Sequence, residues 1–300
     1  MRSKTMFLVG FPVLLFLFLL PLIGQQAAKA PAARQRVDFF ENFVEVEGIG
    51  VPPSAQDPNS SAAYALAREA AMVVADRNLA KLLEGVYIDA TTRVVDLGVE
   101  VSSRINEELK RTKVPGGQVM QETSQAEYAK TKLVRVIVRY PLQEAALPLL
   151  MNVVKEDIRK KEAALPVFQP PALPAPPPPA PASAPVPAHD GVIVRVPAGF
   201  RPSLDPKIFT PKGEIIYGAR SVAMDVLISR GVAQFTNSES KAKATLEGIG
   251  CQSVLTVAGS LRTASDAEVS FDDATRITQA NQKTSFLEKA RVVFLVGKAK

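Results

Sequence analysis

Residues 67–93 read AREAAMVVADRNLAKLLEGVYIDATTR, and this stretch decides the fold of the first half of the chain. Apolar side chains recur in and just before it at gaps of three to five residues, which places them on one face of a helix; they are Tyr64, Ala67, Ala71, Val74, Leu79 and Leu82. Ser60 and Ser61 are suited to cap the start of the helix, and Gly85 to a left-handed turn that ends it. The pattern predicts an amphipathic helix that covers a sheet and is followed at once by a strand.

The segments around this helix predict one α+β domain over residues 37–165. Before the helix, Val44 and Val46 alternate with Glu45 and Glu47, which is the period of a strand with its valines inward. After it we expect an extended segment over 86–101, a helix over 102–111, strands over 118–128 and 132–140, and a helix over 148–164. The inward residues of the last two are Val134, Val136, Val138, Tyr140, Leu149, Leu150, Val153, Val154 and Ile158. The order β-α-β-α-β-β-α predicts helices layered on a sheet.

A proline-rich segment, residues 166–189, follows this domain. Eleven of the 24 prolines lie between residues 166 and 188, alternating mainly with alanine. Such a composition predicts a semi-rigid polyproline II tether, and 23 residues at about 3.1 Å each would reach roughly 70 Å. A docking site for a proline-binding partner is the alternative to a simple spacer, and the spacer is favoured because it needs no partner.

Residues 190–300 predict a second α+β domain, so the fold class is α+β, with two small α/β-sandwich domains joined by the tether. We expect strands over 191–196 and 292–296, a hairpin over 208–216 with its turn at Lys212-Gly213, and apolar strand residues within 245–262. Ser270 is suited to cap a helix that runs to about Lys289. A short repeat, Glu-Gly-Ile-Gly at 47–50 and at 247–250, raises the hypothesis of two related domains.

The first 33 residues predict a targeting segment. Arg2 and Lys4 precede an unbroken apolar run over residues 6–24, and Ala30-Pro31-Ala32 then offers a cleavage signal. The run is also close to the roughly 20 residues that span a bilayer, so a retained membrane anchor is the alternative to a cleaved signal peptide. Gln25, not cysteine, follows the run, so a lipidation site is missing there.

The net charge of +6 is unevenly distributed along the chain. Residues 1–36 carry +5, residues 37–165 carry −3 and residues 190–300 carry +4. Nucleic-acid binding needs a concentrated basic patch with stacking aromatics, and the sequence has no tryptophan and only 6% aromatic residues. We therefore expect no nucleic-acid partner.

The residue types that carry catalysis are scarce. His189 is the single histidine, at the end of the tether, where we expect no precise positioning. Cys251 is the single cysteine and predicts a buried small residue. The adjacent acidic pairs, Glu107-Glu108 and Asp272-Asp273, do not converge on a helix, and Arg77-Asn78 predicts an exposed cation beside a polar helix contact. We predict no catalytic, cofactor-binding or metal-binding residues, no cofactor and no enzymatic activity.

Residues 67–93 contain, in this order, Ala67-Arg68, Ala70-Ala71, Ala75, Arg77-Asn78-Leu79, Gly85-Val86, Ile88 and Thr92. On these positions, residues 43–141 resemble the LPP20-like envelope lipoprotein family and the related N-terminal domain of the flagellar H-ring assembly protein. The resemblance implies a role in cell-envelope or flagellar basal-body assembly. The chain departs from the family in lacking the lipidated cysteine, so an outer-membrane anchor does not carry over. The second domain begins with Gly-x-Ile-x at 191–194, Pro-x-x-x-Pro-x-Ile at 202–208, Lys-Gly-Glu at 212–214 and Tyr-Gly at 217–218. With these motifs, residues 191–218 resemble an accessory module seen beside LPP20-like domains in exported bacterial proteins.

Together these features predict an exported, non-enzymatic cell-envelope protein, located in the periplasm or at the envelope. It would be held in the inner membrane by residues 6–24 if the leader is retained. The expected partners are envelope proteins, flagellar ring components or further copies of the chain, with residues 118–128 and 134–140 offering a sheet edge for self-association. The alternative is a periplasmic ligand-binding module for a cell-wall or small polar ligand.

Overall fold

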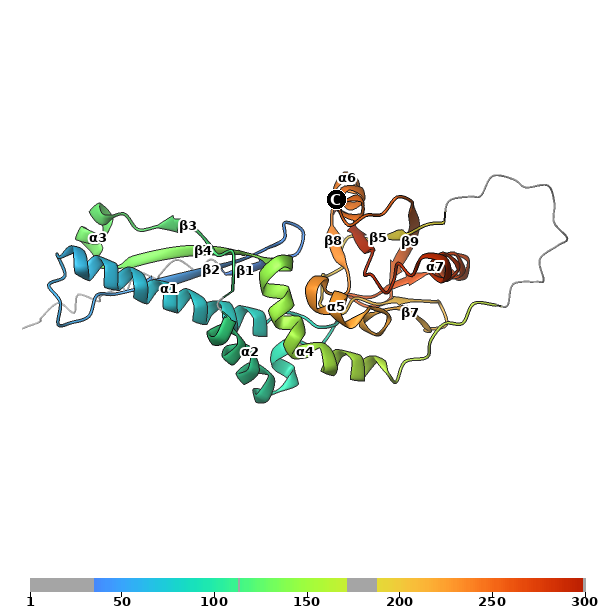
Figure 1. The fold of residues 1–300 in the computed structure, drawn as a ribbon, viewed down its shortest axis with the longest axis horizontal. Helices are drawn as coiled ribbons and strands as arrows, with labels where there is room; N and C mark the ends of the chain where they lie inside the picture. Colours follow the sequence, from blue (N-terminus) through green and yellow to red (C-terminus); the bar gives the residue numbers. More distant parts are fainter. Residues whose placement is uncertain (1–34, 113, 172–187, 299–300) are drawn as a thin grey trace, which may run out of the picture. The chain divides into compact units, whose positions relative to one another are not determined.

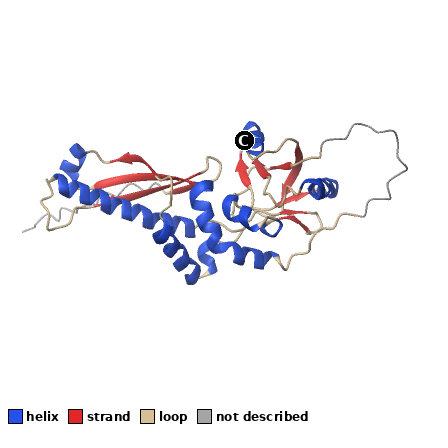
Figure 2. Ribbon diagram, in the orientation of Figure 1, coloured by secondary structure: helices blue, strands red, loops and turns tan. Residues whose placement is uncertain are grey.

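The computed structural model describes residues 35–112, 114–171 and 188–298, which belong to one compact unit. The fold is α+β, as the sequence predicts, with helices packed on two sheets (Figure 1, Figure 2). The predicted leader and residues 172–187 of the predicted tether lie outside the described residues. Within the described part of the chain, no helix combines the length and the apolarity needed to cross a membrane.

The first sheet has four antiparallel strands in the order β1-β2-β4-β3. They are β1 (Arg36–Asp38), β2 (Phe43–Gly50), β4 (Val134–Pro141) and β3 (Gln118–Glu122). Helix α1 (Ser61–Glu84) runs along β2 and β4 (Figure 1). The predicted inward residues of β4 are all buried beneath it.

Five alanines and two leucines form the buried face of α1. Ala63, Ala67, Ala71, Ala75, Leu79, Ala80 and Leu83 are the buried residues of α1. The predicted Tyr64, Val74 and Leu82 are only partly buried, so the buried stripe is rotated from the predicted one. Gly48 and Gly50 explain the rotation, because a Cβ atom there would lie 1.9 Å from the Ala71 carbonyl oxygen and 2.0 Å from that of Ala67. The helix backbone therefore lies directly on β2.

The outer face of this sheet carries buried charge. Glu45 and Glu47 point away from α1 as predicted, yet they are only 7% and 3% exposed. Arg139 contacts the Glu45 carboxylate at 2.7 Å, and Arg135 contacts that of Glu47 at 2.9 Å. Each pair joins β2 to β4, so charge pairing across the strands accompanies the burial of the two acids.

The segment after α1 differs from the prediction. Ser60 caps α1 by accepting the Ala63 N–H at 3.1 Å, as expected, but Gly85 has φ −78° and is right-handed. The predicted strand over 86–101 is wrong. The Asp89 carboxylate accepts the N–H groups of Thr91 and Thr92, which closes a turn, and a 3₁₀ helix, η1 (Val94–Leu97), follows.

Two further elements of the first half have bounds that differ from the predicted ones. Helix α2 (Val99–Thr112) begins three residues before the predicted Ser102 start. The predicted strand over 118–128 ends at Glu122, because Ser124 accepts the Glu127 N–H and starts a helix, α3 (Gln125–Thr131). The last helix, α4 (Leu147–Glu162), follows a π-helical turn, η2 (Leu142–Ala146), and buries all five predicted apolar residues.

The second sheet has seven strands in the order β7-β6-β10-β9-β5-β11-β8. Strands β9 (Val254–Leu261), β5 (Gly191–Val196), β11 (Val292–Val296) and β8 (Gln234–Thr236) are parallel neighbours. β10 (Ala267–Val269), β6 (Ile208–Phe209) and β7 (Ile215–Tyr217) extend the sheet beyond β9. The predicted hairpin is confirmed, with Gly213 at φ 84° in its turn.

The helices of this half are η3 (Ala219–Ser221), α5 (Met224–Arg230), α6 (Glu239–Gly248) and α7 (Phe271–Thr284). Ser270 caps α7 as predicted, although the helix ends at Thr284, before the predicted Lys289. The two copies of Glu-Gly-Ile-Gly have different structures. The first ends strand β2, and the second ends helix α6, so the repeat does not mark two equivalent elements.

Helix α4 connects the two sheets, because it packs on α2 and on α5. Backbone hydrogen bonds add to this junction: the N–H groups of Leu204 and Asp205 donate to the carbonyls of Tyr87 and Ile88, both at 2.9 Å. Residues 166–168, at the start of the predicted tether, pair with the backbone of Ile215 at the edge strand β7.

Candidate functional site

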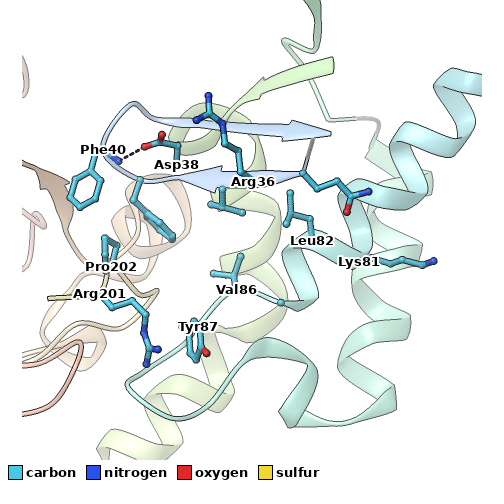
Figure 3. Close-up of a pocket in the computed structure, with 13 residues that line it drawn as sticks. Arg36, Asp38, Phe40, Lys81, Leu82, Val86, Tyr87, Arg201 and Pro202 are labelled. Carbon is cyan, nitrogen blue, oxygen red and sulfur yellow. Dashed lines mark hydrogen bonds between the residues drawn. The ribbon is translucent and has the colours of Figure 1, made fainter. Parts of the chain in front are cut away.

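A cleft of about 620 Å³ opens between β1, the end of α1, the segment after Gly85 and the loop at Arg201-Pro202 (Figure 3). Its walls are mainly apolar and include Val37, Phe39, Phe40, Leu82, Val86 and Pro202. The volume lies within the range of roughly 300–1,000 Å³ that is usual for small-molecule sites. The cleft therefore has the size and the lining of a binding site.

Two arginines flank Tyr87 at one end of the cleft. The guanidinium carbon of Arg201 lies 3.7 Å from the centre of the Tyr87 ring, and that of Arg93 lies 4.8 Å from it. Arg93 also donates to the Tyr87 hydroxyl at 2.8 Å, and this hydrogen bond lowers the pKa of Tyr87 from its ordinary value. Arg201 donates to the Ala90 carbonyl. This end is therefore aromatic and positively charged.

The other end of the cleft is built by the turn between β1 and β2. The Asp38 carboxylate accepts the N–H groups of Phe40 at 3.1 Å and Glu41 at 3.0 Å, which fixes the turn. Arg36 points away from Tyr87 (Figure 3), and its guanidinium lies 4.6 Å from the Phe43 ring centre. Arg36, Lys81 and Arg201 all line the cleft. Arg201 is the cation beside Tyr87, where an anionic group of an otherwise apolar ligand would fit.

The structure positions His189 better than the sequence suggests. Its Nδ1 atom lies 3.0 Å from the Ser253 hydroxyl, and the Thr284 hydroxyl donates to its carbonyl at 3.0 Å. The expectation of an unpositioned histidine is therefore wrong. The neighbouring Asp190 carboxylate accepts the backbone N–H groups of Gln252 and Ser253, so this acid organises the loop before β9.

The remaining predicted candidates have structural contacts. Cys251 is buried as predicted, and burial raises the pKa of its thiol to about 11. Asn78 donates to the Glu47 carbonyl at 2.7 Å, while Arg77 is exposed. Glu108 pairs with Arg111, and Asp273 with Arg276. Over the described ranges, no group of three or more His, Cys, Asp or Glu side chains could hold a metal ion.

Tyr87 and Arg201 were missed at the sequence level. They lie far apart in the chain, and the loop that carries Arg201 reaches the first half only in the folded molecule. The one signal near them is the Gly85-Val86 pair of the family resemblance, and Val86 indeed lines the cleft.

Comparison with known proteins finds a similar family for residues 191–298. No curated protein matches the sequence significantly. Residues 191–298, which contain all seven strands of the second sheet, match a family model described as the second domain of Treponema pallidum Tp0624. This second half is therefore similar to the second domain of that protein.

Proposed function

We propose that the chain is an exported, non-enzymatic cell-envelope protein with a structural or assembly role, and that residues 43–141 form an LPP20-like domain. The flagellar basal body is the assembly we would test first. The observation that carries this proposal is the place of the family-like residues: Ala67, Ala71 and Ala75 are fully buried against β2. They build a scaffold and leave no reactive group among themselves.

The other family-like residues support the same reading. Asn78 ties α1 to the backbone of β2, and Val86 and Ile88 are buried at the junction with the second half. The carbonyls of Tyr87 and Ile88 accept the hydrogen bonds of Leu204 and Asp205. The family-like segment thus joins the two halves of the described chain, which suits a protein that holds partners in fixed positions.

Strand β3 offers a surface for a protein partner. It lies at an edge of the first sheet, and Val119 and Met120 are 40% and 49% exposed. An edge strand carries backbone N–H and C=O groups that can pair with another chain. The proposed partner is a second copy of the chain or another envelope protein that adds a strand to β3.

Sedimentation of the purified protein and of Val119→Lys tests the partner surface. We expect concentration-dependent association that the lysine weakens at least tenfold, because a charge on an edge strand opposes pairing. Val99→Lys is the matched control, since Val99 is 84% exposed and lies outside the sheet. A monomer at all concentrations that also captures no envelope protein in cross-linking would count against the assembly role.

The cleft at Tyr87 favours a second candidate function, a periplasmic ligand-binding module. A ligand that binds only the folded state must raise the melting temperature. Thermal shift with anionic cell-wall fragments, compared between the parent protein and Arg201→Ala, separates the two functions. A shift that the substitution removes supports ligand binding, and unchanged melting temperatures support the scaffold.

A further inference from the structure

A buried carboxyl group fastens the first half of the chain to the second. Glu162, the last residue of α4, is fully buried, and its carboxyl accepts the N–H groups of Ala219 at 3.0 Å and Arg220 at 2.5 Å. A Cβ atom at Gly218 would lie 1.9 Å from the Glu162 Oε1 atom, so the glycine leaves the room for this approach. The carboxyl therefore occupies a fitted position at the start of η3.

A second carboxyl shares that position. The Ala219 N–H lies 3.0 Å from the Glu162 Oε1 atom and 3.1 Å from the Asp205 Oδ1 atom, so the two buried carboxyl groups converge on one donor. Two ionised carboxylates at one donor repel each other, and a proton on one of them removes this repulsion. The geometry thus favours a proton held by the pair.

Within the described part of the chain, no cation forms an ion pair with the Glu162 carboxyl. Lys207 contacts the Asp205 Oδ2 atom at 2.5 Å. The guanidinium of Arg220 donates to the Glu162 carbonyl at 3.3 Å, and that of Arg159 to the Val222 carbonyl at 2.5 Å. The Lys207 ammonium is thus already paired with Asp205, so a proton on Glu162 leaves that ion pair intact.

Two more titratable groups, Asp266 and Tyr217, interact with the pair, and Glu288 interacts with Tyr217. The Asp266 carboxylate accepts the Lys207 N–H at 3.1 Å, and the Tyr217 hydroxyl donates to the Val232 carbonyl. Glu288 adds further negative charge near Tyr217. The surroundings are thus rich in acids, which disfavours a second negative charge beside Asp205.

The protonation follows from these surroundings. Burial and then the charge of Asp205 raise the pKa of Glu162 to about 8. Burial also raises the pKa of Asp266. Between the ordinary pKa of a glutamic acid, 4.5, and about 8, the folded state holds a proton that the unfolded state has lost. Stability therefore falls as pH rises through this window.

We propose that the proton shared by Glu162 and Asp205 latches α4 to the second sheet, and that its loss on alkalinisation loosens the junction between the two halves. This conformational device goes beyond the proposed scaffold role, and it does not depend on the partner or on the compartment. The latch is closed at acidic and neutral pH, and it weakens when both carboxyls are ionised and repel each other.

The direct test is infrared spectroscopy of the full chain labelled with ¹³C at the glutamate side-chain carboxyl. We expect one protonated glutamic acid at pH 6 that is lost by pH 10, and its absence from Glu162→Gln. Because the first measurement uses the unmodified sequence, it stands even if the variant fails to fold. A spectrum without a protonated glutamic acid at pH 6 would overturn the proposal.

Thermal unfolding and hydrogen exchange test whether loss of the proton loosens the junction between the two halves. From pH 5 to pH 9 we expect the melting temperature of the parent to fall by about 5 °C or more, and the amides of residues 218–222 to lose protection after correction for intrinsic exchange. Glu162→Gln keeps the shape without the titration, so its profile should be flatter. Glu69→Gln, at an exposed position of α1, is the control and should follow the parent. Identical pH profiles for parent and Glu162→Gln would refute the latch.

Discussion

Gly48→Ala is the substitution that tests the helix–sheet contact most severely. The added Cβ atom would lie 1.9 Å from the Ala71 carbonyl oxygen and 2.6 Å from the Ala75 nitrogen. Both are backbone atoms of α1, so no side-chain rotation relieves the clash. The helix would have to move away from β2 by more than about 1 Å, because such contacts are otherwise not shorter than 3.0 Å.

The cost follows from what that movement breaks. Overpacking of a well-packed core usually costs about 1–3 kcal/mol, and a rigid backbone neighbour places Gly48→Ala at or above the upper end. Lifting the helix also loosens the buried contacts of Ala67, Ala71 and Leu79. We therefore expect a loss of about 3 kcal/mol or more from the free energy of unfolding, a large fraction of the 5–15 kcal/mol typical of a protein.

The repeat supplies a matched control with the same local sequence. Gly248 ends helix α6, and a Cβ atom there meets nothing within 4 Å. Alanine at that position should stabilise the protein by about 0.5 kcal/mol, because alanine favours the helix. The assay is urea unfolding followed by circular dichroism. A Gly48→Ala protein within 0.5 kcal/mol of the parent would refute the close contact, whatever Gly248→Ala does.

Three other outcomes follow from single contacts. Ser60→Ala should lower the free energy of unfolding by about 1 kcal/mol, because Ser60 caps α1, whereas Ser61→Ala in the first turn should be nearly neutral; chemical denaturation decides. Burial raises the pKa of Asp89, but the two turn N–H groups and Lys161 outweigh it and lower this pKa to about 2. Asp89 therefore contributes about 2 kcal/mol of stability above pH 4, which is lost as pH falls through this pKa and which Asp89→Asn should remove. An unchanged acid-unfolding profile would contradict this. Arg93→Ala should raise the pKa of Tyr87 toward its ordinary value, because the main hydrogen bond to the phenol is lost, and ultraviolet titration of the phenolate measures the shift.

Local patterns predicted the elements whose apolar residues face one core. Strand β4 and helix α4 have apolar residues at the period of their element, β5 and β11 are short apolar runs, and the structure contains all four. The prediction of a strand after α1 was wrong. Its apolar residues Val86, Ile88 and Val94 are buried, as those of a strand would be, but the Asp89 side chain closes a turn in the backbone. Burial alone does not distinguish a strand from an anchored loop.

The sequence did not predict the strand order or the contacts between residues that are far apart in the chain. Strand β11 is the last in the chain and lies inside the sheet, between β5 and β8, because parallel pairing depends on crossovers that no local pattern encodes. Glu162 reads as one more charged residue at the end of a polar helix face, and only the tertiary fold brings it to Asp205. The cleft was missed for the same reason, since Tyr87 and Arg201 meet only across the junction of the two halves.

The measurement that tests the central proposal most directly is N-terminal sequencing of the native protein after cell fractionation. An exported envelope protein predicts an N-terminus near Ala33 in the periplasmic fraction, or an intact Met1 in the inner membrane if the apolar run is retained as an anchor. An intact Met1 in the soluble cytosolic fraction would contradict the envelope role.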